Sequence, residues 1–143
     1  MSFNECMDFV LEWEGGYSVD ADDPGGETKF GISKRAHPLE DITNLTRERA
    51  LAIYHAEYWE RISGDTLPTP VALACMDFAV HSGVARANRS RVDNLSTDHY
   101  QWSRHICYDR IDHLLKLARK PALRKYLRGW LRRVAALLRV IDA

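Results

Sequence analysis

Apolar residues recur every three or four positions along most of this sequence, which is the spacing of one buried face of an α-helix. The segments with this pattern are residues 3–14, 47–62, 70–82, 102–119 and 123–141. Gly15–Gly16, Gly83 and Pro121 follow the first, third and fourth segments, and both residue types end helices. Thr46 and the pair Thr69–Pro70 are typical of helix starts. We therefore expect a mostly α fold.

Two stretches lack a sustained period. Residues 17–43 contain the turn sequence "DPGG" at positions 23–26, and then "TKFGIS", which suits a short strand. We expect a small β-hairpin there, after the first helix. Residues 84–101 are polar and weakly periodic, which predicts a loop with no more than one helical turn.

The length of 143 residues predicts a single domain, residues 1–143, and a monomer. The net charge is zero, but residues 1–60 carry 13 Asp and Glu against 5 Lys and Arg, whereas residues 104–143 carry 11 Lys and Arg against 3 Asp. No secretory signal or membrane span is visible, so we expect a protein made in the cytosol. Three cysteines lie far apart in helical segments, which predicts structural thiols: Cys6, Cys75 and Cys107.

Glu14 is the residue most suited to acid catalysis. It ends the first helical segment, at the negative end of the helix dipole and beside Trp13 and Tyr17. The dipole and partial burial both disfavour a carboxylate and would raise its pKa, as a general acid near neutral pH requires. Asp23 and Thr28 follow in the returning loop. Two carboxylates in unlike surroundings, with a hydroxyl that orients water, are the parts of glycoside hydrolysis.

Simpler interpretations exist for the same residues. A glutamate before Gly-Gly is usually a solvated helix end, and Asp-Asp-Pro-Gly is usually a turn. The segment "DADDPGGE" supplies oxygens, but it lacks the alternation and final glutamate of a calcium loop. The six histidines show no paired ligand spacing, and no serine sits in a strand-turn-helix elbow. We therefore expect no metal and no cofactor.

The stretch "EGGYSVDADDPGGETKFGISKRA" closely resembles the signature of glycoside hydrolase family 108, which comprises bacteriophage endolysins and related bacterial N-acetylmuramidases. The similarity continues through "DITNLTRERALAIYHAEYWERI" and "DTLPTPVALACMDFAVHSG". It covers residues 1–85 well and the remainder thinly. The resemblance implies a compact lysozyme-like domain that hydrolyses the β-1,4 bond between N-acetylmuramic acid and N-acetylglucosamine in peptidoglycan.

The family's catalytic glutamate falls on Glu14. By analogy with other phage lysozymes, Asp23 and Thr28 are the second and third catalytic residues. The candidate substrate-binding residues are Tyr17, Glu27, Tyr58, Trp59, Asp77 and His81, with Phe78 beside them. Glu27 is also a rival second carboxylate, and the Tyr58–Trp59 pair is more often core than sugar platform. The implied role is lysis of a host bacterium, with release from its cytoplasm to the periplasm through a holin-like pore.

The chain departs from the family pattern in two places. His81 stands in "AVHSG" where the family is expected to have asparagine. The basic C-terminal helical region, residues 102–143, looks shortened relative to full-length relatives, whose longer segment resembles a peptidoglycan-binding module. A non-catalytic wall-binding or regulatory descendant is therefore one alternative. A lytic transglycosylase, which needs one acid and no activated water, is another.

The basic C-terminal segment is amphipathic, with arginine and lysine on one face and leucine, valine, tryptophan and isoleucine on the other. The simpler interpretation is a helix that packs on the domain with solvated charges. A more specific interpretation is that the segment is attracted to anionic wall polymers or outer-membrane lipids. Nucleic acid is not an expected partner, because no helix-turn-helix with base-reading side chains is apparent.

Overall fold

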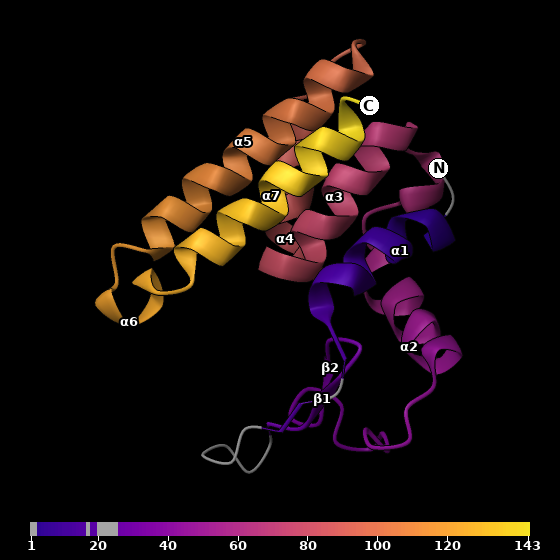
Figure 1. Ribbon diagram of the computed structural model, residues 1–143. Helices are drawn as coiled ribbons and strands as arrows, with labels where there is room; N and C mark the ends of the chain where they lie inside the picture. The colour runs from indigo at the N-terminus through magenta and orange to yellow at the C-terminus, as the bar shows by residue number, and fades with distance from the viewer. Residues whose placement is uncertain (1–2, 17, 20–25) are drawn as a thin grey trace.

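A computed structural model describes residues 3–16, 18–19 and 26–143 (Figure 1). The helices are α1 (Phe3–Glu14), α2 (Arg47–Tyr54), α3 (Thr69–Ser82), α4 (Val84–Asp93), α5 (His99–Leu117), α6 (Pro121–Arg124) and α7 (Leu127–Ile141), with the π-helix η1 (His55–Trp59) and the 3-10 turn η2 (Gly64–Thr66). Two short antiparallel strands, β1 (Thr28–Lys29) and β2 (Ile32–Ser33), form a hairpin. The mostly α class and the small hairpin after the first helix are confirmed.

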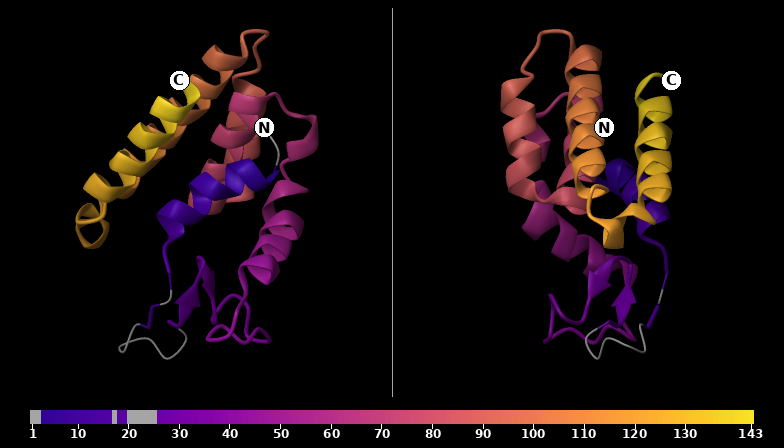
Figure 2. Two further views of the ribbon diagram at one scale, coloured as in Figure 1. Left: turned by 45° about the vertical axis from the view of Figure 1, so that its right-hand side comes forward. Right: turned by 90° about the vertical axis from the view of Figure 1, so that its left-hand side faces the viewer.

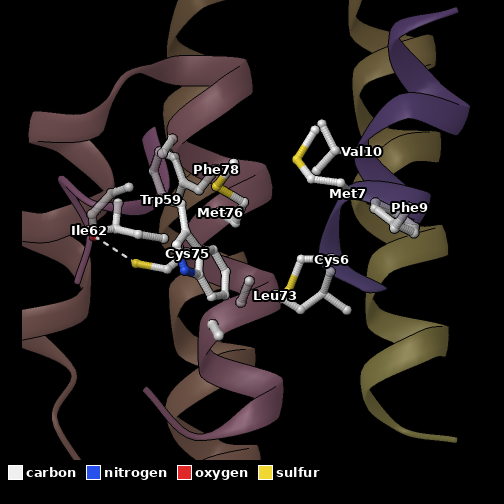
Figure 3. Packing of buried hydrophobic residues seen from close by; sticks show 14 of the residues in the cluster. Cys6, Met7, Phe9, Val10, Trp59, Ile62, Leu73, Cys75, Met76 and Phe78 are labelled. Atoms are coloured by element: carbon white, nitrogen blue, oxygen red, sulfur yellow. Dashed lines mark hydrogen bonds between the residues drawn. The ribbon is translucent and has the colours of Figure 1, made fainter. Parts of the chain in front are cut away.

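Helix α3 forms the centre of the helical body. It is apolar around most of its circumference, with Asp77 as the exception, and every residue from Val71 to Ala79 is buried. It packs against α1, α4, α5 and α7. In Figure 3, Cys6 and Met7 of α1 face Leu73 and Met76 of α3. A helix that is hydrophobic all round is buried on all sides, and α3 is the element around which the others assemble.

Local signals in the sequence fix several helix ends. The Thr46 hydroxyl accepts a hydrogen bond from the Arg49 backbone N–H at 3.1 Å, as an N-cap does. Gly15 (φ +74°) and Gly83 (φ +99°) follow α1 and α3 in backbone conformations that favour glycine. Helix α3 begins at Thr69 itself, one residue before the predicted start, because Pro68 occupies the cap position.

The predicted loop at residues 84–101 is wrong for its first half. Val84–Asp93 forms α4, and only residues 94–98 connect it to α5. The helix carries a short buried stripe, Val84, Ala87 and Ser90, and its remaining side chains are mostly charged or polar. Tertiary contacts supply the missing stabilisation: the Trp102 indole N–H donates to the Arg91 carbonyl at 2.8 Å, for example. Such contacts override weak local periodicity.

The hairpin lies at one end of the molecule, below the ends of α1 and α2, and α5 and α7 run side by side in the helical body (Figure 2). In the described part of the chain, no helix is long and apolar enough to cross a membrane. The prediction of structural thiols is confirmed, because Cys6, Cys75 and Cys107 are buried and unpaired. Burial raises the pKa of each thiol to about 12.

Candidate active site

Glu14 is the last residue of α1 and points into the junction between the helical body and the hairpin. Its side chain is 22% exposed, so it is neither in open water nor sealed in the core. The Arg133 Nη1 group of α7 donates a hydrogen bond to Glu14 Oε1 at 2.8 Å. The expected partial burial is present, and the acid also has a cationic partner that the sequence had not suggested.

Arg133 connects this glutamate to Asp77 at the middle of α3. Its Nη2 donates to Asp77 Oδ1 at 2.7 Å, and its Nε donates to the same oxygen at 3.2 Å. Asp77 is 0% exposed. Burial alone would raise the pKa of Asp77, but the charges of Arg110 and Arg133 outweigh it, and the pKa lies below its ordinary value. Asp77 is therefore an internal carboxylate that holds two arginines.

Arg110 of α5 is the second of these arginines. Its Nη1 donates to Asp77 Oδ2 at 2.5 Å and its Nη2 donates to His81 Nδ1 at 2.7 Å. Since a guanidinium only donates, Nδ1 of His81 must accept, which places the ring proton on Nε2 and leaves the ring neutral. Burial, together with Arg110 and Arg133, lowers the pKa of His81 to about 3. The network from Glu14 to His81 thus joins four helices: α1, α7, α3 and α5.

The hairpin turn touches Glu14 from the opposite side. Gly31 (φ +76°) lies so close that a methyl group added there would come within 2.9 Å of Glu14 Oε2 and 2.3 Å of Tyr54 Oη. The Tyr54 hydroxyl donates to the Phe30 carbonyl at 2.7 Å and so fastens the turn to α2. Glycine is strongly favoured at this position, because an added methyl group would crowd two side chains and the backbone angle would be strained.

Asp23 and Tyr17 lie outside the described residues. Thr28 begins β1, where its hydroxyl donates to the Gly26 carbonyl at 3.2 Å. The Glu27 carboxylate accepts a hydrogen bond from the Thr43 hydroxyl, which ties it to the chain leading into α2. Thr28 and Glu27 thus belong to the hairpin whose turn adjoins Glu14, and their catalytic and binding roles stay predictions.

The structure separates Tyr58 from Trp59. Trp59 is 1% exposed and its indole N–H donates to Asp65 at 2.9 Å, so it lies in the core and has no face for a substrate. Tyr58 is half-buried, and its ring packs 5.6 Å from that of Tyr54, measured between centroids. Phe78 is also in the core, and Asp77 is fully buried and pairs with Arg110 and Arg133. Among these residues, Tyr58 and His81 keep partial exposure.

Arg110 and Arg133 are the residues of this site that the sequence pattern did not identify. Each is a cation on the buried stripe of an otherwise amphipathic helix, with Ile106 and Leu114 around the first and Val134 and Leu137 around the second. A charge in such a position is almost never buried without a partner. That observation signals an internal ion pair, although it does not say with which carboxylate.

Among the described residues, no three His, Cys, Asp or Glu side chains gather closely enough to hold a metal ion. Glu14, Arg133, Asp77 and Arg110 instead form a chain of alternating charge. Such an arrangement fixes the position of a partly exposed carboxyl group.

Comparisons with known proteins identify a family and a similar structure. A family model described as glycosyl hydrolase 108 matches residues 7–83, which include Glu14, the hairpin, Asp77 and His81. The solved structure of Brucella abortus SagA superposes with a TM-score of 0.73 at 28% sequence identity, over 97% of this chain and 92% of that chain. No curated protein gives a significant match. The structural similarity therefore extends through α5 and α7, which supply Arg110 and Arg133.

Proposed function

We propose that this protein is an N-acetylmuramidase, because the chain belongs to glycosyl hydrolase family 108. That family comprises peptidoglycan-degrading glycosidases. Its reaction would be hydrolysis of the β-1,4 bond between N-acetylmuramic acid and N-acetylglucosamine, with Glu14 as the general acid. The observation that carries the proposal is the setting of Glu14: a partly exposed carboxyl group, clamped by Arg133, between the helical body and the hairpin.

The two oxygens of Glu14 have different neighbours, which suggests how the acid works. Arg133 donates to Oε1, so that oxygen must keep a lone pair for the hydrogen bond. Oε2 lies on the side of Gly31 in the hairpin turn. A proton carried on Oε2 leaves the bond from Arg133 intact, and this is the oxygen that would protonate the glycosidic oxygen. Arg133 is then a positioning residue that fixes the direction of proton transfer.

A second carboxylate would stabilise positive charge on the sugar ring or activate water. We propose Asp23 for this role and Thr28 as a hydroxyl that orients the water. The support for Thr28 is its place in β1, in the same hairpin whose turn residue Gly31 adjoins Glu14. Tyr58 and His81, which keep partial exposure, are the proposed contacts for the sugar.

Glu14→Gln tests the acid directly. The amide keeps the shape of the side chain and cannot supply the proton, so clearing of permeabilised Gram-negative cells should slow by about 10²–10⁴-fold. Glu12→Gln is the matched control, because Glu12 lies on the exposed side of the same helix and its variant should clear at the wild-type rate. An unchanged clearing rate for Glu14→Gln would remove Glu14 from the mechanism.

The products distinguish hydrolysis from transglycosylation. A muramidase leaves reducing muramic acid ends, whereas a lytic transglycosylase leaves 1,6-anhydro ends. Mass spectrometry of soluble fragments from purified sacculi should therefore find reducing ends. Anhydro ends would assign the alternative reaction, and sacculi that bind protein without releasing fragments would assign a wall-binding protein.

We further propose that the reaction serves lysis of a host bacterium, with a holin-like pore as the route to the wall. Production in a Gram-negative host should lyse cells when such a pore is made at the same time. Equal lysis with and without the pore would contradict this route.

A further inference from the structure

Helix α7 carries an open groove on the side away from the core. One part is a hollow of about 600 Å³, with Arg124, Arg128 and Arg132 around a floor that includes Leu127 and Leu131. A second hollow of about 430 Å³ adjoins it, since Arg132 and Ala135 line both, and extends to Arg139 and to Trp13 of α1. We call the two together the α7 groove.

The arginines of the α7 groove have no carboxylate partners among the residues that the structure describes. Described carboxylates pair with Arg104, Arg110 and Arg133, but none lies within ion-pair distance of Arg128, Arg132 or Arg139. These three side chains are also exposed. The groove therefore presents uncompensated positive charge beside a recessed apolar floor.

The α7 groove reaches α1 at Trp13, which lines its second hollow and immediately precedes Glu14. The two side chains point about 100° apart, so the groove adjoins the backbone at Glu14 rather than its carboxyl group. Arg132 precedes Arg133, and consecutive residues of a helix point about 100° apart. Arg133 accordingly reaches inward to Glu14 while Arg132 lines the groove. A molecule with one end at Glu14 can thus place an attached chain along the outer side of α7.

A ligand for this groove has to be narrow, anionic and partly apolar. Resting on the proposed function, the substrate carries such a chain: a short peptide with several carboxylates, attached to each muramic acid. Arg132 and Arg139 are seven residues apart, or about 10 Å along the helix. Four extended peptide residues span up to about 14 Å, so two carboxylates of one such peptide can reach both arginines. Guanidinium groups bind carboxylates in paired hydrogen bonds.

We infer that the α7 groove binds the carboxylates of the stem peptide on the muramic acid next to the cleaved bond. A membrane surface fits this site less well. The leucines of the groove floor are half-buried between arginines. Val140, which is 45% exposed, follows Arg139 and so points about 100° away from it. A flat lipid layer could not contact that side chain and the groove floor together.

Binding of a free stem peptide tests the inference without any hydrolysis. The probe is a synthetic tetrapeptide of L-alanine, D-glutamate, diaminopimelate and D-alanine, titrated into the 143-residue protein and followed by NMR. Arg132→Gln with Arg139→Gln should weaken its binding at least tenfold, and wild type should bind an amidated peptide as weakly. Arg86→Gln with Arg89→Gln, an equal charge change on the exposed side of α4, is the control and should change binding less than twofold.

Kinetics give a second readout. The groove variant should raise KM at least fivefold on glycan strands that carry stem peptides and leave KM unchanged on strands stripped of peptide. Equal effects on both strands, or unchanged binding of the tetrapeptide, would overturn the inference. The inference would also be overturned if the groove variant lost binding to phosphatidylglycerol vesicles but still bound the tetrapeptide. That result would assign the groove to lipid. The wild-type protein could bind the peptide through the groove and yet cleave neither kind of strand. That result would refute the muramidase activity and support stem-peptide binding by the α7 groove.

Discussion

Replacing Asp77 by asparagine should destabilise the protein far more than any surface charge change. The asparagine side chain has nearly the same shape, but it removes the negative charge between two arginines. Arg110 and Arg133 have side chains that are 1% and 7% exposed, so neither can turn to water for compensation. Loss of one member of a buried pair costs about 3–5 kcal/mol. In Asp77→Asn, Arg110 would keep only the neutral His81 as a partner, whereas Arg133 would keep its bond to Glu14.

Urea unfolding at pH 7, followed by tryptophan fluorescence, measures this loss, and Asp8→Asn is the matched control. Asp8 pairs with Arg47 at 2.9 Å, but both side chains are exposed, so its replacement should cost at most about 1 kcal/mol. At about 3 °C per kcal/mol, Asp77→Asn should also lower Tm by roughly 9–15 °C. A cost below about 1 kcal/mol for Asp77→Asn would refute the view that this network joins the helices.

Three further outcomes follow from the structure. Gly31→Ala should lower the free energy of unfolding by about 1–3 kcal/mol, because the new methyl group meets the Tyr54 hydroxyl in a strained backbone. Gly15→Ala is the control, since Gly15 has a similar φ and open space around it, and it should lose less in the same thermal unfolding assay. Equal losses would contradict the contact at Gly31. The folded state lowers the pKa of His81 to about 3, so between pH 6.5 and 3 the unfolded chain binds a proton that the folded chain does not. The free energy of unfolding should therefore fall as the pH drops through this range, by at most about 1.4 kcal/mol per pH unit. His81→Asn should flatten that slope in urea titrations at pH 7 and 5, and an unchanged slope would exclude His81 as its source. A thiol reagent at pH 8 should modify the folded protein slowly and the urea-unfolded protein quickly, because burial raises the pKa of all three thiols: Cys6, Cys75 and Cys107.

The sequence predicted what short-range signals control. Gly15 ends α1, Thr46 caps α2, and the "TKFGIS" segment forms the hairpin. Each of these depends on residues within a few positions, whose backbone preferences are readable in the sequence. The position of Glu14 at a helix end was found in the same way.

The sequence could not predict what distant residues decide. Asp77 meets Arg110 across 33 positions and Arg133 across 56, and no local pattern encodes such pairings. Asp77 was therefore expected to contact substrate, whereas its partners are internal. Helix α4 was missed for a related reason, since its stability comes from Trp102 and other tertiary contacts rather than from its own periodicity.

The clamp on Glu14 comes from a residue 119 positions later in the chain, on the last helix. A ribosome therefore completes the acid-bearing helix long before the arginine that orients it exists. Under the proposed function, a nascent chain, or a copy that has lost α7, would carry Glu14 without the arginine that orients it. Such a copy would keep residues 7–83, which the family model matches, and would still lack this bond.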